Sequence, residues 1–467
     1  MKIEQIYTKC LSQGAYYIES NGEVAIIDPL REVQPYLEKA EKDGAKIKYI
    51  FETHFHADFV SGHITLAEKT GAKIVYGPTA KTNFEAHIAK DNESFFVGNL
   101  EIVAIHTPGH TMESTIYLLK DESGKDYAIF SGDTLFIGDV GRPDLAQKGD
   151  ITKEDLAGFL FDSLRHKIMV LNDDVIVYPA HGAGSACGKN LSKETVSTIG
   201  DQKKRNYALR ENMTREEFIK EVTDGLLPPP DYFPLNVKLN KEGYESIYTI
   251  LEKGSKSLSV GQFVEKTEEY DALILDVRHQ FDFIQGFIPK SMFIGLNGTF
   301  APWVGALIKD IHQPIVLVTP EGKEEETITR LARVGFDNVI GYLEGGFESW
   351  KKAGKTIDTL KSITAEELEK NIENNAIVFD VRKPGEFENE HIKDVKSTPL
   401  DYLNNYLSVF PKDKDFFIHC AGGYRSVIAA SILKAKGFNN VIDVAGGFAA
   451  IRKTNIKTTT PVCNISS

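Results

Sequence analysis

The sequence predicts an α/β protein of about three domains. The chain has 467 residues, which is too long for one hydrophobic core and close to three times the usual ~150 residues per domain. Short apolar strands, such as 24–28, alternate with helical patterns, such as 34–43. Residues 255–467 also contain an internal repeat. We expect domains at 1–254, 255–358 and 359–467.

The repeat has two copies of roughly 100 residues each. The motif LILDVR at 273–278 recurs as IVFDVR at 377–382, and GFDNVI at 335–340 recurs as GFNNVI at 437–442. In each copy, near-continuous apolar runs alternate with helical patterns. This alternation is typical of a buried parallel sheet with crossover helices. We therefore expect two small α/β domains with parallel sheets after the first domain.

A proline-rich segment at 227–234 marks the exit from the first domain. Four of its eight residues are prolines, so we expect an extended, stiff segment. Its two aromatic side chains, Tyr232 and Phe233, indicate that it packs against the protein.

Composition restricts the partners and the compartment. A net charge of −13 argues against nucleic acid, and any site for an anionic substrate must be built locally. Neither a signal peptide nor an apolar run long enough to cross a bilayer is evident, so we expect a cytoplasmic protein without a membrane partner. We also expect a homo-oligomer. The cysteines are too scattered for a disulfide framework: Cys10, Cys187, Cys420 and Cys463.

Potential metal ligands occur in order along residues 52–181, in loops that follow apolar strands. A single histidine is usually structural or solvated, but several such elements in this order indicate a metal site. Phe59, directly after the first group of ligands, has no lone pair to donate. The potential ligands are His54, His56, Asp58, His110, Asp133 and His181.

Residues 1–254 resemble the metallo-β-lactamase superfamily, and specifically its persulfide dioxygenase branch, in three motifs. These motifs are THFHADF at 53–59, FIGDVGRPDL at 136–145 and YPAHGAG at 178–184. The resemblance implies an αββα sandwich. It also implies that His54, His110 and Asp133 bind iron, while His56, Asp58 and His181 form an outer shell.

Phe59 indicates one metal rather than two. Members of the superfamily with two metals usually have a histidine at this position, and phenylalanine removes that ligand. Two imidazoles and one carboxylate around one metal form the facial set of non-haem Fe(II) oxygenases, with open positions for a persulfide and O2. We therefore expect one Fe(II) per chain. Zinc has no redox activity and would support only hydrolysis.

Four residues near the metal motifs are candidates for binding the substrate. Arg142 and Asp144 follow Asp133 closely and either hold the substrate or form a salt-bridged turn. Tyr178 belongs to the motif around His181. Cys187 lies six residues after His181 and either guards the site mouth, shuttles sulfane sulfur or is an incidental loop thiol.

The last domain carries a cysteine loop. The sequence FFIHCAGGYRS at 416–426 predicts a buried strand, a tight loop and a helix that begins near Val427. Backbone N–H groups at the helix N-terminus and the charge of Arg425 would favour the thiolate of Cys420. Gly422 and Gly423 give the loop its conformational freedom, and Tyr424 completes the list of binding candidates.

This loop resembles the active loop of rhodaneses, which are sulfurtransferases. Further rhodanese landmarks occur at 380–382, 386–387 and 391–392. Four residues separate Cys420 from Arg425, whereas tyrosine phosphatases have five, so the spacing favours sulfur over phosphate. In the first copy, Thr319 falls about where the cysteine should be, and glutamates at 324–326 would repel an anion. We expect the first copy to be catalytically silent.

The sequence therefore predicts a bifunctional enzyme of sulfide detoxification. A low-molecular-weight persulfide, carried by glutathione, coenzyme A or another thiol, would be oxidised by O2 to sulfite. Transfer of sulfane sulfur through Cys420 would then give thiosulfate. One alternative is a zinc thioester hydrolase of the glyoxalase II kind fused to a sulfurtransferase. Another is a sulfur-relay or binding protein in which the rhodanese-like copies act and the metal domain is vestigial.

Overall fold

The computed structural model describes residues 1–147, 150–189 and 191–459, so Cys463 lies outside the described residues. The chain forms two compact units. One contains residues 1–249 with 331–335, and the other contains residues 250–330 with 336–467. The domain limits expected from the sequence stay a prediction. Within the described residues, the helices are too short or too polar to cross a bilayer.

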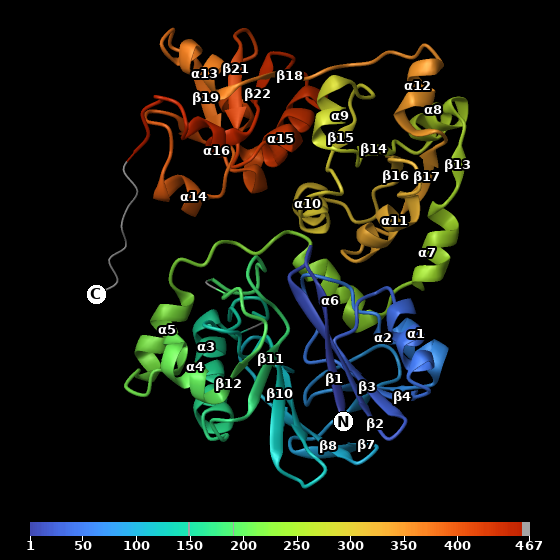
Figure 1. The fold of residues 1–467 in the computed structure, drawn as a ribbon, viewed down its shortest axis with the longest axis vertical. Coiled ribbons are helices and arrows are strands. Elements are labelled where there is room, and N and C mark those ends of the chain that lie inside the picture. Colours follow the sequence, from blue (N-terminus) through green and yellow to red (C-terminus); the bar gives the residue numbers. More distant parts are fainter. Residues whose placement is uncertain (148–149, 190, 460–467) are drawn as a thin grey trace. The chain divides into compact units, whose positions relative to one another are not determined.

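The first unit contains two six-stranded sheets (Figure 1). The first sheet has the order β1 (Lys2–Thr8), β2 (Gln13–Ser20), β3 (Glu23–Ile27), β4 (Lys46–Phe51), β5 (Lys73–Tyr76) and β6 (His87–Ile88). The second has the order β12 (Ser197–Thr198), β11 (Ile176–Pro179), β10 (Asp126–Gly132), β9 (Thr115–Lys120), β8 (Leu100–His106) and β7 (Glu93–Val97).

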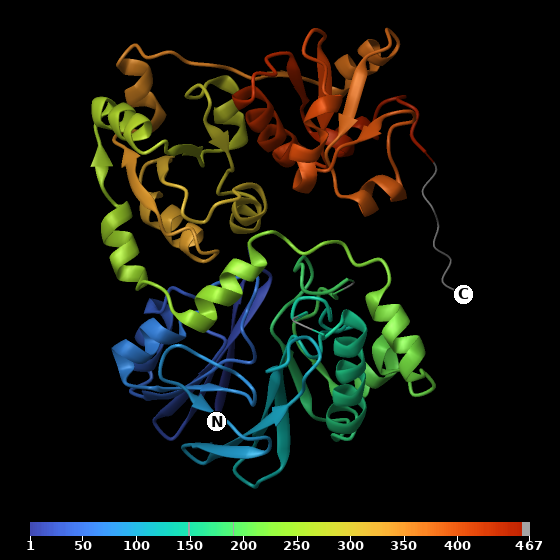
Figure 2. The same ribbon diagram turned by 180° about the vertical axis from the view of Figure 1, so that it is seen from behind.

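The two sheets pack face to face, and helices cover their outer faces. Buried side chains from both sheets, such as Phe51 and Phe130, form one core between them. A second core lies under α1 (Gln34–Lys42) and α2 (His63–Thr70). A third lies under α3 (Lys153–Ser163), the helical turn η1 (Leu164–Ile168), α4 (Ile199–Arg205), the turn η2 (Tyr207–Leu209) and α5 (Arg215–Thr223). This is the expected αββα sandwich, whose layers can be followed from behind in Figure 2.

Local sequence signals explain where several helices begin. Thr152 caps α3 by accepting a hydrogen bond from the backbone N–H of Asp155, whose carboxylate accepts one in return from the N–H of Thr152. Thr214 and Glu217 form the same reciprocal pair at the start of α5. These capping pairs satisfy N–H groups that have no partner within the helix.

The proline-rich segment differs in part from the expectation. Its aromatic side chains do pack, since Tyr232 is 4% and Phe233 2% exposed. However, the segment is not extended throughout, because α6 (Phe233–Glu242) begins within it. Pro234 occupies the first turn of α6, where its missing N–H would have no partner in the helix anyway. The next helix, α7, spans Ile247–Gly254.

The second unit contains two five-stranded parallel sheets. The first has the order β13 (Ser257–Leu258), β17 (Val339–Leu343), β16 (Ile315–Val318), β14 (Leu273–Asp276) and β15 (Met292–Phe293). The second has the order β18 (Lys361–Ile363), β22 (Val441–Val444), β21 (Phe416–His419), β19 (Ile377–Asp380) and β20 (Lys396–Ser397). Both copies therefore have one topology, which confirms the repeat.

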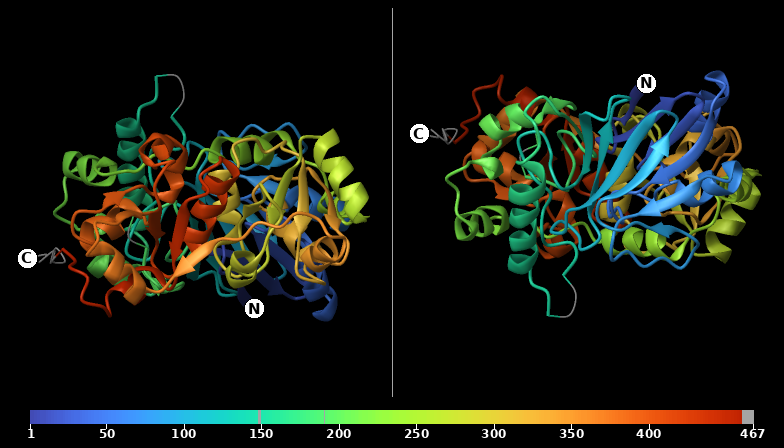
Figure 3. Two further views of the ribbon diagram at one scale, coloured as in Figure 1. Left: turned by 90° about the horizontal axis from the view of Figure 1, so that it is seen from above. Right: turned by 90° about the horizontal axis from the view of Figure 1, so that it is seen from below.

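Helices flank both parallel sheets (Figure 3). The first copy contains α8 (Val260–Glu269), α9 (Gln280–Gln285), α10 (Phe300–Leu307), α11 (Glu324–Ala332) and α12 (Gly346–Lys352). The second contains α13 (Ala365–Ile372), α14 (Pro384–Asn389), η3 (Leu400–Val409), α15 (Tyr424–Ala435) and α16 (Gly447–Ile451). The helix after the cysteine loop, α15, begins at Tyr424, three residues before the expected start near Val427, because Gly423 in the left-handed region is its N-cap.

Candidate functional site

The potential metal ligands lie in loops at one edge of the sandwich. His54 and His56 follow β4, His110 follows β8, Asp133 follows β10 and His181 follows β11. All five side chains are at most 2% exposed. The sheets therefore bring together residues that are up to 127 positions apart in the sequence, and they shield these side chains from solvent.

Three of these side chains form a group suited to one metal ion. His110 Nε2 lies 3.4 Å, and His54 Nε2 3.8 Å, from Asp133 Oδ2. Neither carboxylate oxygen of Asp133 has a hydrogen-bond partner among the described residues, although both are buried. An unpaired buried carboxylate facing two imidazoles is costly without a cation. The donor set therefore fits a metal ion.

The remaining ring nitrogens of the two histidines are already bonded, which orients the rings. His110 Nδ1 lies 2.9 Å from the carbonyl oxygen of Arg142 and can donate to it. His54 Nδ1 lies 3.0 Å from the hydroxyl of Thr53, and that hydroxyl donates to Asp28 Oδ2 at 2.9 Å. Such outer contacts leave Nε2 free for a metal. Burial and three neighbouring histidines also lower the pKa of His54, which favours the neutral ligand form.

His56 is paired with two acids outside the group of His54, His110 and Asp133. Its Nε2 lies 3.0 Å from Asp28 Oδ1 and 3.4 Å from Glu52 Oε2. Burial lowers the pKa of His56, but the two carboxylates outweigh burial and raise it well above its usual value. Phe59 is fully buried against His56, with ring centroids 4.3 Å apart. The geometry thus pairs His56 with acids, and a ligand atom of His56 also lies within 4.8 Å of those of Asp58 and His181.

Asp58, His181 and Cys187 surround the other side of Asp133. His181 Nε2 lies 3.5 Å from both Asp58 Oδ2 and Asp133 Oδ1. The Cys187 sulfur falls within 4.8 Å of ligand atoms of Asp133 and His181. Burial, together with the charges of Asp58 and Asp133, raises the pKa of Cys187 and favours its protonated thiol. Cys187 therefore lies at the metal group and not in a remote loop.

The other three candidates of the first domain are engaged in packing and ion pairing. Arg142 donates to both carboxylate oxygens of Asp144, at 2.6 and 2.7 Å, and to the carbonyl oxygen of Leu227 at 2.5 Å. This geometry favours the salt-bridged turn. Tyr178 stacks on Phe130 at 5.3 Å between ring centroids.

The cysteine loop follows β21 and leads into α15. Cys420 is 1% exposed, and its sulfur accepts hydrogen bonds from the backbone N–H of Gly423 at 3.1 Å and from the hydroxyl of Ser426 at 3.5 Å. Gly423 adopts φ +95°, a left-handed conformation that favours glycine. Gly422 is exposed, with no atom within 4 Å of the position that a Cβ would occupy. The loop thus directs N–H and O–H donors at the sulfur.

Arg425 does not stand as a free cation beside Cys420. Its guanidinium donates two hydrogen bonds to the carboxylate of Glu386 in α14, at 2.5 and 2.8 Å. Burial raises the pKa of Glu386, but the Arg425 charge outweighs it and lowers that pKa. Any anion that approaches Arg425 therefore shares the guanidinium with Glu386.

The first copy lacks the sulfur nucleophile. Val318 pairs with Asp276 as His419 pairs with Asp380, so the next residue, Thr319, is equivalent to Cys420. The hydroxyl of Thr319 donates to the Glu324 carboxylate at 3.1 Å. The Glu324 carboxylate is thus bonded to the residue equivalent to Cys420, where its charge would repel an anionic substrate.

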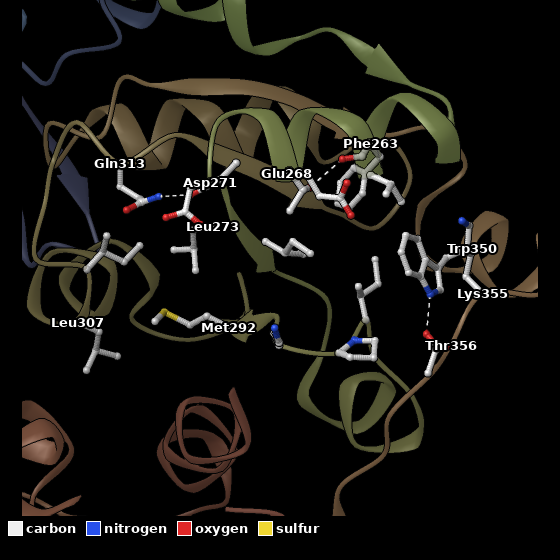
Figure 4. Close-up of a pocket in the computed structure, with 18 of the residues that line it drawn as sticks. Phe263, Glu268, Asp271, Leu273, Met292, Leu307, Gln313, Trp350, Lys355 and Thr356 are labelled. Carbon is white, nitrogen blue, oxygen red and sulfur yellow. Dashed lines mark hydrogen bonds between the residues drawn. The ribbon is translucent and has the colours of Figure 1, made fainter. Parts of the chain in front are cut away.

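A pocket of about 780 Å³ lies elsewhere in the first copy (Figure 4). It is at the amino ends of β14, β15 and β16, whereas Thr319 follows the carboxyl end of β16. Phe263, Met292 and Trp350 contribute to its apolar lining. Its described lining residues include no cysteine or histidine, so the pocket offers neither a thiol nucleophile nor an imidazole ligand.

Sequence reasoning missed several partners of the site residues. Asp28 directly follows β3 in a left-handed conformation (φ +49°), and an aspartate after an apolar run was the available signal. Thr53 was visible only as the neighbour of His54. Glu386 was recognised as a landmark, but its pairing with Arg425 across 39 residues had no local signal.

Comparison with known proteins agrees with this geometry. Residues 9–181 match the metallo-β-lactamase superfamily, and residues 259–353 and 364–454 each match the rhodanese-like domain. The chain is 30% identical to the human mitochondrial persulfide dioxygenase ETHE1 over 220 residues, which cover 47% of this chain and 78% of that protein.

Hydrolases are similar to a comparable degree. The chain is 34% identical to the probable hydroxyacylglutathione hydrolase glo2 of Schizosaccharomyces pombe over 160 residues, 34% of this chain. The chain spans only 58% of that relative's length. A crystal structure of a metallo-β-lactamase from Staphylococcus aureus shares 31% identity and a TM-score of 0.64, covering 74% of this chain and 98% of that chain. The chain therefore belongs to the metallo-β-lactamase superfamily, and it joins a domain of that superfamily to two rhodanese-like domains.

Proposed function

We propose that the first domain is a persulfide dioxygenase with one Fe(II), and that Cys420 of the last domain transfers sulfane sulfur. In the first reaction, a persulfide R–S–SH, O2 and water give the thiol R–SH, sulfite and two protons. An iron ion held by His54, His110 and Asp133 would supply the redox chemistry that joins oxygen to the outer sulfur. The relative ETHE1 is named a persulfide dioxygenase, which supports this proposal.

The observation that carries the proposal is the position of Phe59 and His56. Phe59 offers no donor, and His56 Nε2 is paired with the carboxylates of Asp28 and Glu52. His54, His110 and Asp133 form one group of two imidazoles and one carboxylate, which suits one ion with open positions for two small reactants. A second ion in the neighbouring group of His56, Asp58 and His181 would have to share His56 with Asp28 and Glu52.

The protein's own residues perform three tasks in this site. Thr53 and the Arg142 carbonyl hold the two imidazoles with Nε2 directed inward. Asp58 and His181 lie across from Asp133 and can exchange a proton or a hydrogen bond with bound water or substrate. The buried thiol of Cys187 adds one polarisable sulfur to the wall of the site, which suits a polarisable persulfide.

The second reaction forms and breaks one S–S bond at a time. The Cys420 thiolate attacks the outer sulfur of a persulfide, and the carrier leaves as its thiol. Sulfite then attacks the sulfur carried by Cys420, thiosulfate leaves, and the Cys420 thiolate is restored. The N–H of Gly423 and the hydroxyl of Ser426 stabilise the negative sulfur in both steps. Fusion would raise the effective concentration of sulfite at the second site.

The second candidate function is zinc-dependent thioester hydrolysis, because hydroxyacylglutathione hydrolases are among the relatives. Both candidates can be tested on one preparation loaded in turn with iron and with zinc. We expect the iron form to consume O2 with glutathione persulfide and neither form to hydrolyse S-lactoylglutathione efficiently. Efficient hydrolysis by the zinc form without O2 uptake by the iron form would favour the second candidate.

The transfer step is tested by Cys420→Ser with Thr319→Ala as the control. Serine keeps the size but stays protonated near neutral pH, so thiosulfate formation should stop while O2 uptake continues and sulfite accumulates. Thr319→Ala changes the equivalent position of the silent copy and should alter neither reaction. Thiosulfate formed at the normal rate by Cys420→Ser would disprove the assignment.

A further inference from the structure

The side chain of Tyr424 leaves the cysteine loop and enters the first rhodanese-like copy. Its hydroxyl donates a hydrogen bond of 2.6 Å to the carbonyl oxygen of Gly295, which lies 129 positions earlier in the chain. Both copies belong to the same compact unit. Tyr424 is thus the residue of the active loop that is bonded directly to the silent copy.

Glycine at position 298 makes room for this ring. A Cβ on Gly298 would lie 2.3 Å from Cζ of Tyr424 and 2.5 Å from Cε1. Real Cβ atoms do not approach other atoms so closely, so any larger residue would force the ring or the backbone to move. Gly298 therefore leaves room for a side chain of the other rhodanese-like copy, that of Tyr424.

The surrounding contacts fix this arrangement. The backbone N–H of Phe293 in β15 donates to the hydroxyl of Ser431 in α15 at 3.0 Å, and both residues are at most 1% exposed. The rings of Phe293 and Tyr424 meet edge to face, with centroids 6.1 Å apart. Helix α15 is therefore held against the first copy at two positions, seven residues apart.

Tyr424 lies between the two residues that shape the environment of the nucleophile. Gly423 gives its N–H to the Cys420 sulfur, and Arg425 pairs with Glu386. On its other side, the loop is bonded to α16, because the N–H of Phe448 donates to the Cys420 carbonyl oxygen at 2.7 Å. The loop is thus held from within its own domain on one side and from the silent copy on the other.

We propose that Tyr424 is a positioning residue, and that the silent copy serves the transfer site by holding Tyr424 through Gly295 and Gly298. This inference rests on the proposed sulfur transfer at Cys420. With Tyr424 fixed, the first turn of α15 presents the Gly423 N–H to the sulfur before substrate binds, which is preorganisation of a donor. The Tyr424 hydroxyl is already bonded to the Gly295 carbonyl, so it is not available to a substrate.

A double-mutant cycle in the full chain tests the proposal. Gly298→Ala should lower kcat/KM for thiosulfate formation by about 10-fold, because the added methyl displaces the Tyr424 ring. It should also raise the pH at which alkylation of Cys420, followed by mass spectrometry of its peptide, reaches half its maximal rate. Tyr424→Ala should cause similar changes. In the double variant, Gly298→Ala should have no further effect, because the ring it displaces is gone.

Two controls separate positioning from general damage. Gly261→Ala in α8 adds a methyl where no atom lies within 4 Å, so neither readout should change. Tyr424→Phe removes only the hydroxyl and should cause a smaller change than Gly298→Ala. Multiplicative effects in the double variant, or normal alkylation and transfer in Gly298→Ala, would overturn the proposal. The alkylation readout does not depend on sulfur transfer, so failure of the proposed function would be visible separately, as thiosulfate formation by Cys420→Ser.

Discussion

Phe59 lies against the imidazole of His56, with ring centroids 4.3 Å apart and an interplanar angle of 31°. Phe59 directly follows Asp58 in the chain, and its side chain cannot bind a cation. It also packs on His56 while Asp28 and Glu52 hold the imidazole nitrogen. Phe59 therefore has two effects: it leaves position 59 without a metal donor, and it packs against the imidazole of His56.

Replacing Phe59 with histidine should allow a second metal ion. The new imidazole would add a donor beside His56, whose ligand atom already lies within 4.8 Å of those of Asp58 and His181. We expect the zinc content of Phe59→His to rise from about one toward about two ions per chain, measured by elemental analysis after dialysis. Phe59→Leu removes the ring without adding a donor and should stay near one. Two ions bound to the leucine variant would show that the ring does not limit metal number.

The hydroxyl of Thr53 should contribute to metal affinity through His54. It bonds His54 Nδ1 and is itself held by Asp28, so its loss frees the ring to rotate. We expect Thr53→Val to weaken iron binding by roughly 10–100-fold, as outer partners of ligands commonly do, and Thr53→Ser to restore it. Competition with a chelator provides the measurement. Equal affinity in the valine and serine variants would mean that the hydroxyl plays no part.

Exchanging the charges of Arg425 and Glu386 tests two roles separately: the ion pair's contribution to stability, and the attraction of Arg425 for sulfite. Arg425→Glu alone places two carboxylates together and should lower Tm and transfer. Adding Glu386→Arg restores the ion pair and should recover much of Tm. Transfer should stay at least ~10-fold low, since one charge-assisted contact contributes about 1.5–3 kcal/mol. Full recovery of thiosulfate formation in the exchanged protein would show that Arg425 acts only through Glu386.

Asp443 should make the stability of the last domain depend on pH. Burial raises its pKa to about 6, and the residue is 1% exposed. The folded protein therefore retains this proton at pH values where the unfolded chain has released it. The contribution of Asp443 to the free energy of unfolding must therefore fall by on the order of 2–3 kcal/mol as pH rises from about 4 to about 6. Above that pH it stays low.

Asparagine cannot ionise but still accepts the hydrogen bond that the Ser362 hydroxyl donates to Asp443 at 2.9 Å. Asp443→Asn should therefore raise Tm relative to wild type at pH 7.5 and change it little at pH 4. Scanning calorimetry at both values checks this. An identical shift at both pH values would show that ionisation of Asp443 is not the cause.

The features that could be predicted from the sequence are those that depend on residues close together in the chain. The ligand motifs, the repeat and the position of Thr319 follow from short motifs and strand patterns, and the αββα sandwich and parallel sheets are confirmed. The pairing of Arg425 with Glu386 and the insertion of Tyr424 beside Gly298 depend on segments 39 and 126 positions apart. No periodicity encodes such contacts. The earlier start of α15 was missed because a left-handed Gly423 served as its N-cap.

We propose above that the first domain holds one iron ion and uses it to oxidise a persulfide. The most direct measurement combines the metal content of anaerobically purified protein with its O2 uptake on glutathione persulfide and the sulfite formed, using Cys420→Ser to prevent consumption of sulfite. We expect about one iron per chain, with one sulfite formed for each O2 consumed. Two zinc ions per chain in the active protein, with no O2 uptake when iron is supplied, would contradict it.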